Sequence, residues 1–146
     1  TCALPILIAF RDTFNHSTGV VVETDGGLVL KHYNRSFRNV DIDFLPNTPV
    51  PLHASSAGQV FMSYSTYQPQ NQAQAQLIEQ IRSRGYAVRH HPTQGIPGAQ
   101  SIACPLRNEK GELVAIAVTM GFFSADDMPQ IAGQLVRSVE ALHLQE

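Results

Sequence analysis

Apolar side chains recur at three- and four-residue steps in four stretches of the chain, a spacing typical of helices with one buried face. The first predicted helix runs from Pro5 to about Asn15, and a second begins near Ser56. A third follows a polar connector predicted over 69–76, which is rich in Gln and Asn, and the fourth lies near the C-terminus. The apolar stripes are Ile6, Leu7, Phe10 and Phe14; Ala57, Val60, Phe61 and Tyr64; Leu77, Ile78 and Ile81; and Ile131, Ala132, Leu135, Val139 and Leu142.

Residues that start or stop helices flank these stripes. Pro5 and Pro129 fit the first turns of the first and last helices, because a first-turn residue needs no backbone donor. Asp126 or Asp127 can cap the last helix, and Gly85 is a suitable stop for the third.

Other stretches have the pattern of β-strands. The β-prone runs 20–23 and 28–33 flank the turn Asp25-Gly26-Gly27, which predicts a hairpin. Segment 40–44 alternates between apolar and acidic residues, so we expect a half-buried strand. Further strands are predicted at 86–90, 100–106 and 113–120, and a Pro/Gly-containing loop at 92–98 is a candidate lid.

These elements predict a single α+β domain, an α/β sandwich over residues 1–146. A chain of 146 residues with 43% hydrophobic content fills one core of ordinary size. Segment 113–120 is apolar at nearly every position, which indicates a strand covered on both faces. We therefore expect a central, mostly antiparallel sheet, with the terminal helices on one face and loops with the two middle helices on the other.

Charge and cysteine usage exclude several functions. The net charge of −2 and the isoelectric point near 6.3 argue against a nucleic-acid surface, which needs clustered Lys and Arg. Cys2 and Cys104 lie far apart without metal or redox spacing, which favours free thiols in a reducing cytoplasm over a disulfide, the alternative that the spacing leaves open. The apolar run 3–10 is too short to span a bilayer. No membrane association is expected.

Catalytic and metal sites are not expected either. Adjacent residues on a strand point to opposite faces, so His90 and His91 cannot chelate one metal ion together. Asp41 and Asp43 alternate with apolar residues, as on a solvated strand face, and do not suggest paired-carboxylate catalysis. Cys104 is expected to be a buried, unreactive thiol. We assign no catalytic residue, no metal and no cofactor.

The segment 50–58 carries the strongest chemical signal in the chain. Its sequence, Val-Pro-Leu-His-Ala-Ser-Ser-Ala-Gly, is a rigid approach to a helix whose first turn has only small side chains. The first N–H groups of a helix lack intrahelical partners and carry a partial positive charge. A carboxylate can therefore dock on the backbone of Ser56 and Ala57. Ser55 and Ser56 also fit ordinary roles as helix-cap residues.

This segment resembles the start of the effector domain in the IclR family of transcriptional regulators, which has a Pro-Leu-His-Ala-Ser/Thr-x-x-Gly run here. The resemblance continues, in order, through 81–88, 101–106 and 108–121. It implies a GAF-like or PAS-like fold with an effector held between the sheet and the middle helices. It also implies assembly into homodimers or homotetramers through the terminal helices and a sheet edge.

The resemblance further implies a winged helix-turn-helix domain before this region. The chain begins with Thr1-Cys2 rather than methionine, so we expect a fragment from which that domain is absent. Any contact with DNA would then be made only through the missing domain.

Compared with family members that bind small acids, four positions differ. Those members have a cysteine where Ser101 stands, an aspartate where His91 stands, and serines where Val118 and Met120 stand. The changes make the pocket more apolar and remove one negative charge. We therefore predict a carboxylate effector with an apolar or aromatic body. The predicted effector-binding residues are Val40, Ile42, Val50, Ser56, Ala57, His91, Ser101, Val118 and Met120.

Two other functions fit parts of the pattern. Val118 and Met120 are also suited to an ordinary core, as in a structural dimerisation domain with an empty pocket. A thiol-dependent reductase on a GAF-like scaffold is the third possibility, because a fold does not fix a function. It would need more cysteines than Cys2 and Cys104 provide.

Overall fold

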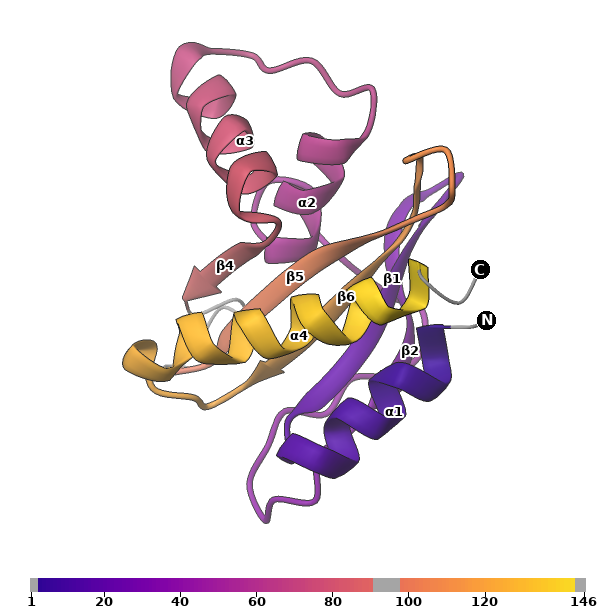
Figure 1. The fold of residues 1–146 in the computed structure, drawn as a ribbon, viewed down its shortest axis with the longest axis vertical. Helices are drawn as coiled ribbons and strands as arrows, with labels where there is room; N and C mark the ends of the chain where they lie inside the picture. Colours follow the sequence, from indigo (N-terminus) through magenta and orange to yellow (C-terminus); the bar gives the residue numbers. More distant parts are fainter. Residues whose placement is uncertain (1–2, 91–97, 144–146) are drawn as a thin grey trace.

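A computed structural model describes residues 3–90 and 98–143 and contains a six-stranded sheet with helices on both faces (Figure 1). The strand order is β3-β2-β1-β6-β5-β4, and every neighbouring pair is antiparallel, which confirms the predicted sheet. The hairpin around Asp25 is also confirmed, as β1 and β2. The strands are β1 Ser17–Thr24, β2 Gly27–Asn34, β3 Thr48–Pro49, β4 Ala87–His90, β5 Gln100–Arg107 and β6 Leu113–Gly121.

The helices form two separate layers, as predicted. The terminal helices α1 and α4 lie together against one face of the sheet, and α2 and α3 pack beside each other on the opposite side (Figure 1). A short 3-10 turn, η1, leads into α4. The bounds are α1 Ala3–Phe14, α2 Ser56–Tyr64, α3 Gln72–Arg84, η1 Ala125–Asp127 and α4 Met128–His143.

Alternation along β5 and β6 divides the core into two halves. Ile102 and Cys104 point toward α1 and α4, whereas Ala103 points toward α2. On β6, Ile116 and Val118 likewise face the α2 side. This parity agrees with the sequence prediction, and it directs one face of β6 toward the first turn of α2.

Segment 40–44, predicted to be a strand, is not a strand in the structure. Side-chain hydrogen bonds fix this segment, and it has no ladder of backbone hydrogen bonds. The Asp41 carboxylate accepts hydrogen bonds from the hydroxyls of Ser17 and Ser36, and the Tyr33 hydroxyl donates to the Ile42 carbonyl. Asp41 is therefore half-buried and bonded rather than on a solvated strand face.

Two helix starts also differ from prediction. The third helix begins at Gln72, inside the predicted connector, because the Asn71 side chain accepts a hydrogen bond from the Gln74 amide at 2.9 Å. Ser124 caps η1, and Asp126 and Asp127 lie within that turn instead of capping α4. Gly85 ends α3 with a φ of 89°, as predicted. The candidate lid 92–98 lies outside the described residues except for Gly98.

The first turn of α2 is pressed against the segment that precedes it. A Cβ atom at Gly58 would lie 1.9 Å from the carbonyl oxygen of Leu52 and 2.7 Å from that of Pro51. Both obstacles are backbone atoms, so a side chain cannot be accommodated by a rotamer change. Glycine at this position sets the path of the chain into α2.

We predict that Gly58→Ala lowers the free energy of unfolding by about 1–3 kcal/mol or more, since the new methyl group must displace backbone. Gly26→Ala is the matched control, because a Cβ there meets nothing within 4 Å. Urea unfolding of both variants is the measurement. Equal stability of the two variants would contradict the close approach at Gly58.

Candidate functional site

A cavity of about 320 Å³ lies between the first turn of α2 and the α2-facing side of the sheet. Segment 42–51 closes it from the side. Its lining includes seven of the residues predicted from the sequence, namely Ile42, Val50, Ser56, Ala57, Ser101, Val118 and Met120. Residues distributed over 79 positions of sequence, from 42 to 120, are thus brought to one place.

The N-terminus of α2 provides the polar end of this cavity. Ser55 is the N-cap residue, and its Oγ accepts a hydrogen bond from the Gly58 amide at 2.9 Å. The same Oγ donates to the Pro51 carbonyl at 2.6 Å, which fixes the cap to the preceding segment. Within residues 3–90 and 98–143, the amides of Ser56 and Ala57 donate no hydrogen bond. Two donors at the positive end of the helix are therefore available to a ligand.

A pair of hydroxyl groups lies beside these amides. Ser56 Oγ and Ser101 Oγ are 2.8 Å apart, and the two residues are buried. Ser101 is in β5 directly opposite Met120 of β6, so the pair sits next to the apolar wall. A hydroxyl both donates and accepts, and either serine can turn its proton toward a ligand oxygen.

Apolar side chains form the rest of the cavity. Val118 is 2% exposed and Met120 is 9% exposed, and both line it from β6. Val21, Leu30 and Phe44 also line the cavity and were not among the predicted site residues. Two signals could have indicated them: Val21 and Leu30 lie on the same face of the predicted hairpin, and Phe44 follows Ile42 by two residues. Among the described residues that line the cavity there is no Asp, Glu, Lys, Arg or His. Within this described lining, the charge of a bound anion would be met by backbone dipoles and serine hydroxyls.

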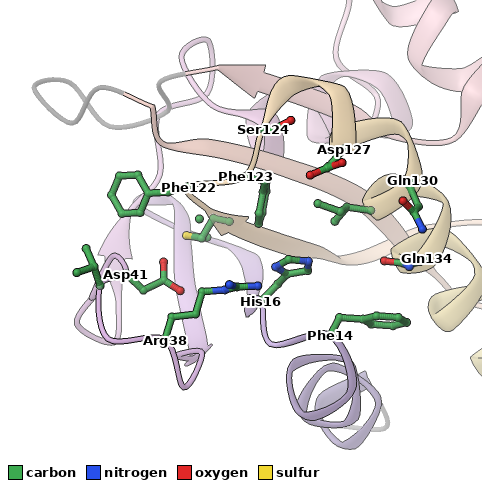
Figure 2. A pocket seen from close by; sticks show the side chains of 14 residues that line it. Phe14, His16, Arg38, Asp41, Phe122, Phe123, Ser124, Asp127, Gln130 and Gln134 are labelled. Carbon is green, nitrogen blue, oxygen red and sulfur yellow. The ribbon is translucent and has the colours of Figure 1, made fainter.

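Two predicted site residues do not join this group. Val40 is 74% exposed and lines a different cleft, shown in Figure 2, because segment 40–44 lacks the strand alternation that placed it beside Ile42. The structure therefore places Val40 outside this cavity. His91 lies outside the described residues.

Other chemistry is not assembled in the described part of the chain. Cys104 is buried among the residues that face α1 and α4, and burial raises the pKa of its thiol to about 12. The prediction of a buried thiol is thus confirmed. In residues 3–90 and 98–143, no three His, Cys, Asp or Glu side chains gather in a way that could hold a metal ion. No helix in those ranges is long and apolar enough to cross a membrane.

Solved structures share this architecture over almost the whole chain. HmgR of Pseudomonas aeruginosa matches with a TM-score of 0.86 and 23% identity, over 98% of this chain and 64% of that one. The Thermotoga maritima IclR matches with a TM-score of 0.80 and 14% identity, over 98% and 66%. The inducer-binding domain of the PobR transcription factor from Acinetobacter, a double mutant in complex with 3-hydroxybenzoic acid, matches with a TM-score of 0.77 and 16% identity, over 97% and 95%.

The chain therefore has the fold of the effector-binding domains of IclR-family regulators, as the sequence resemblance implied. It spans less than two thirds of the HmgR and Thermotoga maritima IclR chains, but nearly all of the PobR inducer-binding domain. No family model matches the sequence, and no curated protein sequence matches it. The likeness is one of structure.

Tyr33 anchors one wall of the cavity through its hydrogen bond to the Ile42 carbonyl, and desolvation by burial raises its pKa to about 12. Because this pKa lies above the usual value of 10, the folded state retains the phenol proton longer than the unfolded state. The contribution of the Tyr33 phenol proton to the free energy of unfolding is fully present below pH 10 and is lost as the pH rises toward 12.

We predict that Tyr33→Phe lowers the free energy of unfolding by about 1 kcal/mol at pH 7, the usual net value of one hydrogen bond. The difference between wild type and variant should shrink between pH 10 and 12, because the phenol ionises in the unfolded wild type over this range while the folded state retains the proton. Denaturant unfolding across this pH range measures it. A constant difference up to pH 12 would show that Tyr33 titrates normally.

Proposed function

We propose that this chain is the effector-binding domain of an IclR-family transcriptional regulator and that its effector is an organic carboxylate with an apolar or aromatic body. The observation that carries the proposal is a pair of backbone amides, those of Ser56 and Ala57, that donate no hydrogen bond to any described residue. They lie at the end of an apolar cavity whose described lining has no charged side chain. A buried carboxylate needs hydrogen-bond donors, and these amides lie at the positive end of α2.

The polar end of the cavity fits one carboxylate group. Its oxygens can accept from the amides of Ser56 and Ala57, while the hydroxyls of Ser56 and Ser101 supply a further donor. Hydrogen bonds to an ionised acceptor are about twice as strong as those between neutral groups. An acid is therefore favoured over its amide, although both have similar shapes.

The apolar walls favour an effector with a hydrocarbon body. Val118 and Met120 offer no hydroxyl to a small polar acid, whereas burying their side chains against a ring removes apolar surface from water. A volume of about 320 Å³ is at the small end of the range for ligand sites and suits an acid with a single ring. The complex of the PobR domain with 3-hydroxybenzoic acid supports this class by analogy.

In this role the effector changes the affinity of the regulator for DNA by binding one conformation of the domain better than another. The DNA-binding domain would lie outside this chain, and the regulator would act as a homodimer or homotetramer in the cytoplasm. The thiol-reductase alternative is disfavoured because Cys104 lies on the opposite face of the sheet from the cavity. The experiment must distinguish the effector-binding domain from the remaining alternative, a structural domain with an empty cavity.

The test is a thermal-shift screen with benzoate, phenylacetate and phenylpropionate, compared with glyoxylate, pyruvate and neutral benzamide. An acid at one hundred times its dissociation constant stabilises by about 2.7 kcal/mol, which raises the melting temperature by several degrees. We expect the aromatic acids to do so and benzamide to have a much smaller effect. An increase in melting temperature with glyoxylate and pyruvate alone would contradict the apolar effector. No change in melting temperature with any acid would favour the structural domain with an empty cavity.

The double variant Val118→Ser/Met120→Ser locates the site, because it restores the hydroxyls that small-acid binders of the family carry. It should lose most of the response to aromatic acids and gain one to pyruvate or glyoxylate, each measured against its own ligand-free melting temperature. Val114→Ser is the matched control: it is on the same strand with the same parity but is 63% exposed and outside the cavity. Equal responses of the two variants would place the ligand elsewhere.

A further inference from the structure

A second cleft, of about 430 Å³, lies where β1 begins and β6 ends (Figure 2). One wall is the segment around Arg38, and the opposite wall is η1 with the start of α4. Figure 2 shows Arg38 beside His16 on one side, Asp127 across the cleft, and Gln134 projecting from α4. Its character is polar and charged, unlike that of the cavity under α2.

Arg38 is held in place but keeps most of its donors free. Its Nε donates to the Asn15 carbonyl at 2.7 Å, which orients the guanidinium group. Its terminal nitrogens make no hydrogen bond or ion pair with any residue in the described ranges. Such a fork can bind a carboxylate through two parallel hydrogen bonds.

One carboxylate in the cleft is also free. Asp127 is exposed in η1, and its side chain makes no hydrogen bond or ion pair within residues 3–90 and 98–143. It does not pair with Arg38, because the two ion pairs found in those ranges are Arg11–Asp12 and Arg35–Asp43. A positive and a negative group therefore face one cleft without neutralising each other.

Two further titratable side chains, Asp41 and His16, line the cleft, and Asp41 adds a second carboxylate to it. The Asp41 carboxylate is already held by the hydroxyls of Ser17 and Ser36 and by the Ile42 amide at 2.8 Å. Burial, and then the charge of Arg38, lower the pKa of His16, although Asp41 and Asp127 act in the opposite direction. His16 is thus uncharged at pH 7, and its ring packs edge-on against Phe123 at 4.9 Å between centroids.

We propose that this cleft binds a zwitterion, an α-amino acid with an apolar side chain, as a second ligand distinct from the carboxylate effector. The ligand carboxylate lies on the guanidinium of Arg38, its ammonium group on Asp127, and its side chain against Phe14 and Phe123. An acid without an amine would leave Asp127 unmatched, and an amine without an acid would leave Arg38 unmatched. Met120 lines both cavities.

The test is an NMR titration of the chain with L-leucine and two analogues. L-leucine carries both charges, N-acetyl-L-leucine carries only the negative charge, and L-leucinamide carries only the positive charge. We expect L-leucine to shift the amide signals of residues 121–134 in a saturable way. The two analogues should bind there at least about tenfold more weakly, because each loses one charge-assisted contact. No saturable shift with L-leucine, or equal shifts with an analogue, would overturn the proposal.

Two charge-neutralising variants and two controls complete the experiment. Arg38→Gln and Asp127→Asn should each weaken the binding of L-leucine at least about tenfold. The control variants Arg137→Gln and Asp126→Asn change residues outside the cleft lining and should leave the affinity for L-leucine unchanged. If Arg38→Gln disturbs the spectrum of the free protein, the pair Asp127→Asn and Asp126→Asn decides alone. Equal losses in a control variant would refute the site. This test is independent of the proposed effector, because binding of the effector would shift the amide signals of residues 50–58 and not those of residues 121–134.

Discussion

The contact between the backbone of Gly58 and the carbonyl groups of Pro51 and Leu52 determines how α2 enters the fold. It brings the proline-rich approach so close to the helix that only a hydrogen atom fits between them. Ser55 can then cap the Gly58 amide and bond to the Pro51 carbonyl with the same hydroxyl. The cavity, its polar end and its apolar wall all follow from this one placement.

In the proposed function, this arrangement lets a cavity whose described lining has no charged side chain prefer an anion. A buried lysine or arginine would carry a large desolvation cost in the absence of ligand. The amides of Ser56 and Ala57 carry only partial charges, and their orientation is set by the helix, so little reorganisation is needed when a carboxylate arrives. The apolar side chains nearby lower the local dielectric and strengthen those hydrogen bonds. On this proposal, Val118 and Met120, which line the cavity, would select among acids by the shape and polarity of the group attached to the carboxylate.

The two cavities differ in the way they present charge. The cavity under α2 uses helix dipoles and hydroxyls, whereas the cleft at Arg38 uses full charges on exposed side chains. Met120 stands between them, and segment 38–44 contributes to both walls. That segment is held by side-chain hydrogen bonds instead of a strand ladder, so it has fewer bonds to break if it moves.

Local signals in the sequence were sufficient for most elements and for the parity of β5 and β6. The hairpin at Asp25, the stop at Gly85 and the faces of Ala103 and Val118 depend on neighbours in sequence. Segment 40–44 could not be predicted in this way, since its partners Ser17, Tyr33 and Ser36 become neighbours only after β1 and β2 have paired.

The candidate site was predictable to a similar extent. Ser56 and Ser101 were each identified, but their hydrogen bond joins residues 45 positions apart and depends on how α2 lies over the sheet. Val40 lies outside this cavity because its segment is not the strand that the alternation predicted.

The most direct measurement of the central claim is the NMR response of individual amides to benzoate. If the carboxylate binds the start of α2, the signals of Ser56 and Ala57 should move downfield along one saturable curve. The Gly58 amide, already bonded to Ser55, should move much less. Saturable shifts that avoid Ser56 and Ala57, or the absence of any saturable shift, would contradict the account.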